Sequence, residues 1–137
     1  MDQSRASVRI RVRWADEDGY GHVNNAVYLN YLEEARDRIV DQLFPTAGND
    51  FVIAHIGIDY RAEITHLDRE VDVESRITGY GRSSVRTTEV IRKLDGTVAA
   101  EAETVLVPRD AETGGSRPLR AEEVAVLDSL ATPAPPV

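Results

Sequence analysis

One stretch of this chain has the period of a long helix, and it constrains the fold more than any other feature. Between residues 25 and 44, apolar side chains recur every three or four positions, which indicates an amphipathic helix of about five turns. Asn24 or Asn25 is a suitable N-cap, and Pro45 ends the helix because proline disfavours helical geometry at the preceding residue. A helix with one apolar face needs another element to cover that face.

Alternating patterns typical of half-buried strands surround this helix. One runs from Val8 to Trp14, with arginines between its apolar residues. Asp95-Gly96 is a strong hairpin signal between two of the later strands. The strands predicted after the helix cover residues 52–60, 71–77, 85–93 and 97–107, and a short second helix is predicted at about 120–130. The predicted fold class is α+β, with one long central helix wrapped by a five-stranded, mainly antiparallel sheet.

Length and composition predict a single domain. The chain has 137 residues and no internal repeat, and we assign residues 1–130 to one domain. Residues 131–137 contain three prolines and are predicted to be a flexible tail. The predicted sheet has edges, which proteins usually protect, and it leaves one face uncovered. We therefore expect a homodimer.

Charge and cysteine content exclude several classes of protein. The formal charge of −8 argues against binding to nucleic acid, which requires clustered basic residues. The sequence has no cysteine, so it forms no disulfides, and it shows neither a signal peptide nor an apolar run long enough for a membrane span. We expect a cytoplasmic protein that does not bind membranes. No histidines stand at metal-ligand spacing, so no metal is expected.

The tract between the first strand and the long helix concentrates the reactive side chains. Asp18 precedes a turn containing Gly19 and Gly21, and the helix begins at Asn24 or Asn25. A carboxylate in this position could act as a nucleophile or general base, or it could only hydrogen-bond its own turn. The free N–H groups of a helix start favour negative charge, so the amide near Asn25 could polarise a carbonyl group.

The same tract carries a resemblance to a known family. It is similar to the hotdog-fold thioesterases, and most similar to the 4-hydroxybenzoyl-CoA thioesterase-like branch of acyl-CoA thioesterases. The similarity covers roughly residues 7–108. The motif is Asp16-x-Asp18-x-x-Gly21-His22-Val23-Asn24-Asn25-x-x-Tyr28-x-x-Tyr31-x-Glu33-Glu34-Ala35-Arg36.

The resemblance implies a hydrolase that converts an acyl thioester into a free acid and coenzyme A. It also implies a homo-oligomer, either a dimer or a tetramer. Asp18 occupies the position of the family's catalytic acid, and the amide near Asn25 that of its carbonyl-binding donor. His22 and the Asn25 side chain are predicted to orient substrate or water. No cofactor is expected, since coenzyme A is part of the substrate. The predicted substrate-binding residues are Gly19, Gly21, Asn24, Tyr28, Arg61, Arg82 and Ser83.

Some alternatives stay open at this stage. Tyr20 and Asn25 depart from related motifs that carry Asn and His at those positions, so the sequence leaves both the nucleophile and the general-base role open for Asp18. The arginines could be solvated, and Tyr28 could belong to the core. A non-catalytic acyl-CoA binding module and a hotdog hydratase or dehydratase are the alternative functions.

Overall fold

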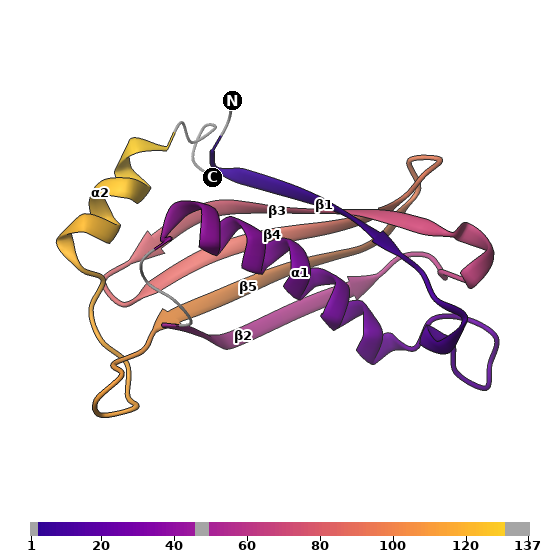
Figure 1. Ribbon diagram of the computed structural model, residues 1–137, viewed down its shortest axis with the longest axis horizontal. Helices are drawn as coiled ribbons and strands as arrows, with labels where there is room; N and C mark the ends of the chain where they lie inside the picture. Colours follow the sequence, from indigo (N-terminus) through magenta and orange to yellow (C-terminus); the bar gives the residue numbers. More distant parts are fainter. Residues whose placement is uncertain (1–2, 46–49, 131–137) are drawn as a thin grey trace.

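The computed structural model describes residues 3–45 and 50–130, so the predicted tail at 131–137 lies outside the described residues. The two helices and five strands occur in the predicted order (Figure 1). The elements are β1 (Arg5–Arg11), the 3-10 turn η1 (Trp14–Asp16), α1 (Asn25–Leu43), β2 (Phe51–Tyr60), the 3-10 turn η2 (His66–Asp68), β3 (Glu70–Gly81), β4 (Ser84–Lys93), β5 (Val98–Pro108) and α2 (Ala121–Ser129).

The five strands form one antiparallel sheet in the order β1-β3-β4-β5-β2. Figure 1 shows α1 lying along one face of this sheet, so the predicted α+β class is confirmed. The loop before α1 lies at one end of the sheet, whereas α2 and the turn between β3 and β4 lie at the other. This separation decides which predicted site residues meet within one chain.

The long helix forms as predicted because its ends are well defined. Asn24 is the N-cap, and its side-chain oxygen accepts a hydrogen bond of 2.8 Å from the amide of Ala26. The helix ends at Leu43, with Phe44 as the C-cap and Pro45 directly after it. One face of the helix is buried on the sheet, through Tyr28, Tyr31, Leu32, Ala35, Arg36, Ile39 and Leu43.

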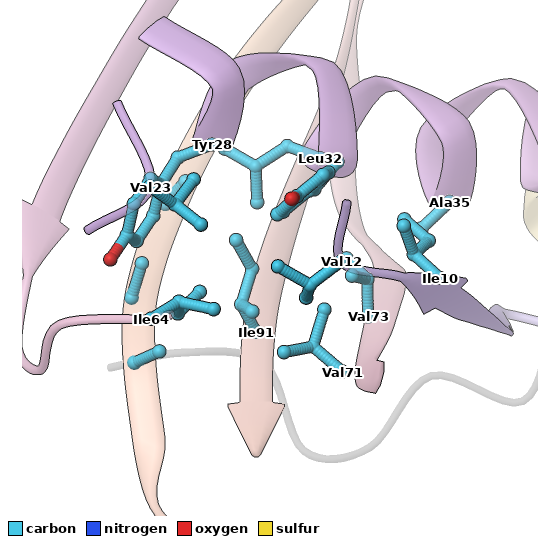
Figure 2. Close-up of a cluster of buried hydrophobic side chains, with 14 residues drawn as sticks. Ile10, Val12, Val23, Tyr28, Leu32, Ala35, Ile64, Val71, Val73 and Ile91 are labelled. Carbon is cyan, nitrogen blue, oxygen red and sulfur yellow. The ribbon is translucent and has the colours of Figure 1, made fainter. Parts of the chain in front are cut away.

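The core lies between this helix face and the sheet. Figure 2 shows Tyr28, Leu32 and Ala35 of α1 close to aliphatic side chains of the strands and loops. A second buried cluster surrounds Ile39 and Leu43 and includes Leu127 of α2, so both helices contribute to burial. The residues labelled on the sheet and loop side in Figure 2 are Ile10, Val12, Val23, Ile64, Val71, Val73 and Ile91.

An ion pair that the sequence did not predict lies inside the protein. Arg36 of α1 is 2% exposed, and its Nη2 atom lies 3.6 Å from Oε1 of Glu89 on β4, which is fully buried. Glu89 also accepts hydrogen bonds from the hydroxyls of Ser75 at 2.8 Å and Thr104 at 2.7 Å. Removing one partner of such a pair would leave a buried charge uncompensated, so it ties the helix to the centre of the sheet.

The first strand has the predicted length but lies three residues earlier in the chain, and this corrects the placement of Trp14. Strand β1 ends at Arg11, opposite Glu70, the first residue of β3. Beyond that point β3 offers no further strand residues for pairing, so the chain turns into η1 and Trp14 is 76% exposed. The strand predicted at residues 71–77 is longer in the structure, because β3 continues through Gly81.

A search of the described residues for membrane spans finds no helix that is both long and apolar enough to cross a bilayer.

Candidate active site

The loop between β1 and α1 is anchored at Asp16. This carboxylate is 5% exposed and accepts hydrogen bonds from the Tyr31 hydroxyl at 2.7 Å and from the Arg13 amide at 3.0 Å. The Arg13 guanidinium adds an ion pair at 3.1 Å. Burial alone would raise the pKa of Asp16, but these hydrogen bonds and the nearby positive charge outweigh it and leave the pKa below its ordinary value.

A second anchor joins this loop to the turn before β3. Oε2 of Glu17 accepts from the backbone amide of His66 at 2.7 Å and lies 2.6 Å from Nδ1 of the same residue. The hydrogen bond from the His66 amide, followed by that from its ring, lowers the pKa of Glu17. Asp16 and Glu17 therefore hold the loop in place.

Asp18 begins the tip of the loop, a tight turn over residues 18–22. Its amide donates to the carbonyl of His22 at 3.1 Å, and Gly21 donates to the carbonyl of Asp18 at 3.2 Å. Oδ1 of Asp18 accepts from the amide of Tyr20 at 2.8 Å, whereas the described residues provide no hydrogen-bond partner for Oδ2. The carboxylate therefore holds its own turn and keeps one oxygen free for a ligand.

The two glycines of the turn differ in what they require. Gly21 has a φ of +85°, a conformation that side-chain-bearing residues rarely adopt. Gly19 has no positive φ, and a Cβ atom added there would meet nothing within 4 Å. Of the two glycines, only Gly21 is therefore required for its backbone conformation.

The first amide of α1 is available to a ligand. Asn24 uses its side chain to cap the helix, and its own amide donates to the carbonyl of Asp16 at 3.0 Å. For the amide of Asn25, by contrast, the structure records no acceptor within residues 3–45 and 50–130. A free donor at a helix start is suited to an oxygen that gains negative charge.

A cavity of about 230 Å³ adjoins this helix start. Its wall includes the predicted residues His22, Asn25, Tyr28 and Arg61. The ring of Tyr28 is packed edge-on against that of Tyr60, with centroids 5.0 Å apart, and its hydroxyl donates to the carbonyl of Ala62 at 3.0 Å. Asp18, Gly19 and Gly21 are not among the lining residues of the cavity; they belong to the turn that ends at His22, whose carbonyl accepts from the Asp18 amide.

Sequence reasoning missed Tyr60, which lies at the end of β2. Its hydroxyl donates to the carbonyl of Asn25 at 2.9 Å, so it tethers the helix start to the sheet. The alternating pattern of β2 placed Tyr60 on a strand, but no local signal pairs it with a residue so distant in the chain. His22 makes only a long contact of 3.4 Å between Nδ1 and the Val23 carbonyl.

The predicted arginine contacts are divided between the two ends of the sheet. Arg61 lines the cavity and forms ion pairs with Glu101 at 3.1 Å and Asp59 at 3.8 Å. Arg82 and Ser83 form the turn between β3 and β4, at the opposite end of the sheet from Asp18 (Figure 1). One chain alone therefore does not bring Arg82 or Ser83 to this cavity. Within the described residues, no group of three or more His, Cys, Asp or Glu side chains is arranged to hold a metal ion.

Comparison with known proteins identifies the family. The model of the thioesterase-like superfamily matches residues 12–137. The long-chain acyl-CoA thioesterase FadM of Escherichia coli is 33% identical over 127 residues, covering 89% of this chain and 96% of that protein.

Solved structures agree with this assignment. A thioesterase from Thermus thermophilus, crystallised with coenzyme A and zinc, is 36% identical, with a TM-score of 0.80 over 88% of this chain and 90% of that one. A predicted thioesterase from Bacillus stearothermophilus is 25% identical, with a TM-score of 0.82 over 95% and 99% of the two chains. The chain therefore belongs to the thioesterase-like superfamily and has the hotdog fold of that family.

Proposed function

We propose that this protein hydrolyses an acyl-CoA thioester to a free acid and coenzyme A. The observation that carries the proposal is the pairing of two free groups on one rigid loop. Asp18 has a carboxylate oxygen without a partner in the described residues, and the Asn25 amide has no acceptor there. Thioester hydrolysis needs these two components, a nucleophile or base and a donor for the developing oxyanion.

Two routes use this arrangement. In the first, Asp18 removes a proton from water, and the hydroxide attacks the thioester carbonyl. In the second, the Asp18 carboxylate attacks directly, and water then hydrolyses the resulting anhydride. In both routes the carbonyl oxygen gains negative charge, which the Asn25 amide stabilises, and the carbon–sulfur bond breaks to release coenzyme A. Side chains, backbone amides and water supply the proposed chemistry.

The side chains of His22 and Asn25 complete the proposed site. Both line the cavity beside the helix start, so either can orient water or the acyl carbonyl. Tyr28 and Arg61 form other parts of the same wall and are proposed substrate contacts. Gly21 supports the site by allowing the chain to reverse between Asp18 and the helix.

Acyl-CoA as the substrate is supported by the relatives. FadM from Escherichia coli is a long-chain acyl-CoA thioesterase, and the Thermus thermophilus thioesterase was crystallised with coenzyme A. Coenzyme A carries phosphates, and arginine is well suited to contact them. We place this reaction in the cytoplasm, as expected from the sequence.

We further propose that the protein acts as a homodimer joined through β2. This strand pairs with β5 on one side, and in the described part of the chain no strand pairs with its other edge. Val52 and Ile53 are exposed on it, and a long exposed edge with apolar side chains favours association. Antiparallel pairing of two β2 strands would bring Arg82 and Ser83 of a second copy to the same end of the combined sheet as the cavity.

The proposal is tested by measuring free thiol release from a panel of acyl-CoAs of different chain length, including aromatic acyl groups. We expect turnover with at least one member, together with formation of the free acid. Tight binding of acyl-CoA without thiol release would indicate a binding module. A product that has gained or lost water while keeping its thioester would indicate a hydratase or dehydratase.

A further inference from the structure

Trp14, the first residue of η1, is exposed where a ligand can reach it. Trp14 is the single tryptophan of the chain, and it is 76% exposed. It comes three residues after Arg11, the last residue that β1 pairs with β3, and lies in the same connection between β1 and α1 as Asp18. An indole exposed to this extent gains little from the fold, but it offers a flat surface for another ring.

A groove of about 780 Å³ lies beside this indole, and we call it the Trp14 groove. Its polar and aromatic lining consists of Arg11, Arg13, Trp14, His66, Arg69 and Glu70. Three arginines and one glutamate thus gather around one hollow in a chain whose formal charge is −8. Because Asp16 offsets the charge of Arg13, the positive charge that favours an anionic ligand here comes from Arg11 and Arg69.

The arginines of this groove differ in whether their guanidinium groups are paired with a carboxylate. Arg13 is paired with Asp16, whereas the structure gives Arg11 and Arg69 no side-chain partner within residues 3–45 and 50–130. Arg69 has a φ of +67°, the sole positive value for a residue other than glycine in the described chain. The fold therefore holds an arginine in a strained backbone conformation at the wall of this groove.

Free arginines beside an exposed aromatic ring match the chemistry of a nucleotide. Guanidinium groups contact phosphate oxygens through paired N–H donors, and bases stack on indole rings. We propose that the Trp14 groove binds a phosphorylated adenine nucleotide. Its source is either the nucleotide end of coenzyme A, in which case the inference rests on the proposed function, or a free adenine nucleotide.

The position of the groove allows the first source. Trp14 precedes Asp18 by four residues, so their Cα atoms are at most about 14 Å apart. The pantetheine arm of coenzyme A extends from the thioester sulfur to the nucleotide and bridges a gap of this size. A substrate could then place its carbonyl at Asp18 and its base on Trp14.

Because Trp14 is the single tryptophan, its fluorescence reports on this groove alone. We expect adenosine 3′,5′-bisphosphate, the probe for the nucleotide end of coenzyme A, to quench the emission with a saturable dependence on concentration. Inorganic pyrophosphate, which has no base, serves as the comparison. An equal response to pyrophosphate would overturn the stacking contact, and the absence of saturable quenching would overturn the site.

Two variants separate the contributions of ring and charge. Arg69→Gly removes the guanidinium and suits the positive φ, so it removes a contact without adding strain; we expect about fivefold weaker binding. Trp14→Ala, measured by calorimetry, should weaken binding about tenfold, and Trp14→Phe should restore part of it. Arg38→Ala, on the exposed surface of α1, is the matched control and should bind as the wild type does. Equal binding by Arg69→Gly and wild type would remove Arg69 from the site.

Kinetics then identify the source of the nucleotide. The ratio of kcat/KM for acyl-CoA to kcat/KM for the same acyl group on pantetheine measures the contribution of the nucleotide. A fall of this ratio in Trp14→Ala and Arg69→Gly assigns the groove to the substrate. An unchanged ratio, with saturable quenching by ATP, assigns it to a free nucleotide. Quenching without hydrolysis of any thioester would contradict the proposed function but would still support nucleotide binding in the Trp14 groove.

Discussion

The two halves of the connection between β1 and α1 are built in opposite ways. In the first half, Asp16 is buried and accepts from Tyr31 and Arg13, and Glu17 accepts from His66. In the second half, Asp18 contacts only its own turn, and the Asn25 amide has no acceptor among the described residues. Two aspartates separated by one residue thus have different surroundings and, we infer, different tasks.

This difference shows how a loop can be both rigid and reactive. The anchored half fixes the backbone on both sides of the tip, since Asp16 also accepts from the amide of Asn24 through its carbonyl oxygen. The tip can then present a carboxylate and an amide that are not satisfied by the protein. Holding reacting groups in position before the substrate arrives reduces the reorganisation that the reaction requires.

Among changes to the backbone of this connection, the largest expected effect comes from removing the free amide while keeping the helix. Asn25→Pro does this, because proline is favoured at the first helical position and Asn24 already has the extended conformation that precedes proline, with ψ of 137°. We expect kcat for thiol release to fall about 10²- to 10³-fold. Asn25→Ala keeps the amide and is the matched control. Equal rates for the two variants would exclude this amide as the oxyanion donor.

Removing the anchor should affect stability most. Asp16→Ala leaves the buried Tyr31 hydroxyl without its acceptor, and we expect a loss of about 2–3 kcal/mol in the free energy of unfolding. Urea denaturation measures this loss. Tyr31→Phe removes the other partner, so the double variant should lose less than the sum of the two single losses. Strictly additive losses would show that the hydrogen bond contributes nothing.

The same anchor predicts a dependence of stability on pH. The pKa of Asp16 is lower in the folded protein than its ordinary value, so its contribution is present above about pH 4, the unfolded pKa, and is lost as the pH falls through the folded pKa. The stability difference between wild type and Asp16→Asn should therefore be larger at neutral pH than in acid. Urea unfolding of both proteins at neutral and at acid pH checks this. A stability difference that grows in acid would contradict the lowered pKa of Asp16.

The smallest effect is expected at the tether between β2 and the helix start. Tyr60→Phe removes the hydroxyl that donates to Asn25 but keeps the ring packed on Tyr28. We expect stability to fall by about 0.5–1 kcal/mol, because the hydrogen bond is exposed. Thermal unfolding and thiol release measure the two consequences. A large drop in kcat at unchanged stability would show that the hydroxyl contacts the substrate.

Much of the fold could be predicted from local patterns. The helix start at Asn25 follows from its cap, and the hairpin at Asp95-Gly96 follows from its turn, where Gly96 has a φ of +91°. The end of β1 could not be predicted in this way, because the alternation of residue types continues to Trp14 after the pairing has ended. Pairing depends on where β3 begins, which is information from a distant part of the chain.

The same distinction between local and distant information applies to the candidate site. The signature made Asp18, Asn24 and Asn25 candidates because they are close together in the sequence. The contacts of Asp16 with Tyr31 and of Tyr60 with Asn25 join separate elements, and no local pattern specifies them. Arg36 is a similar case, since an arginine on a helix is expected to face solvent, and its buried partner Glu89 comes from another element.

The most direct test of the different roles of Asp16 and Asp18 is thiol release by Asp18→Asn. It is measured on protein whose urea unfolding matches that of the wild type. The substitution keeps the size of the side chain and its hydrogen bond to Tyr20, but it removes the charge needed for attack or proton transfer. We predict a fall in kcat of about 10²- to 10⁴-fold with stability retained. Turnover within a few-fold of the wild type would contradict the assignment of Asp18 as the reacting group.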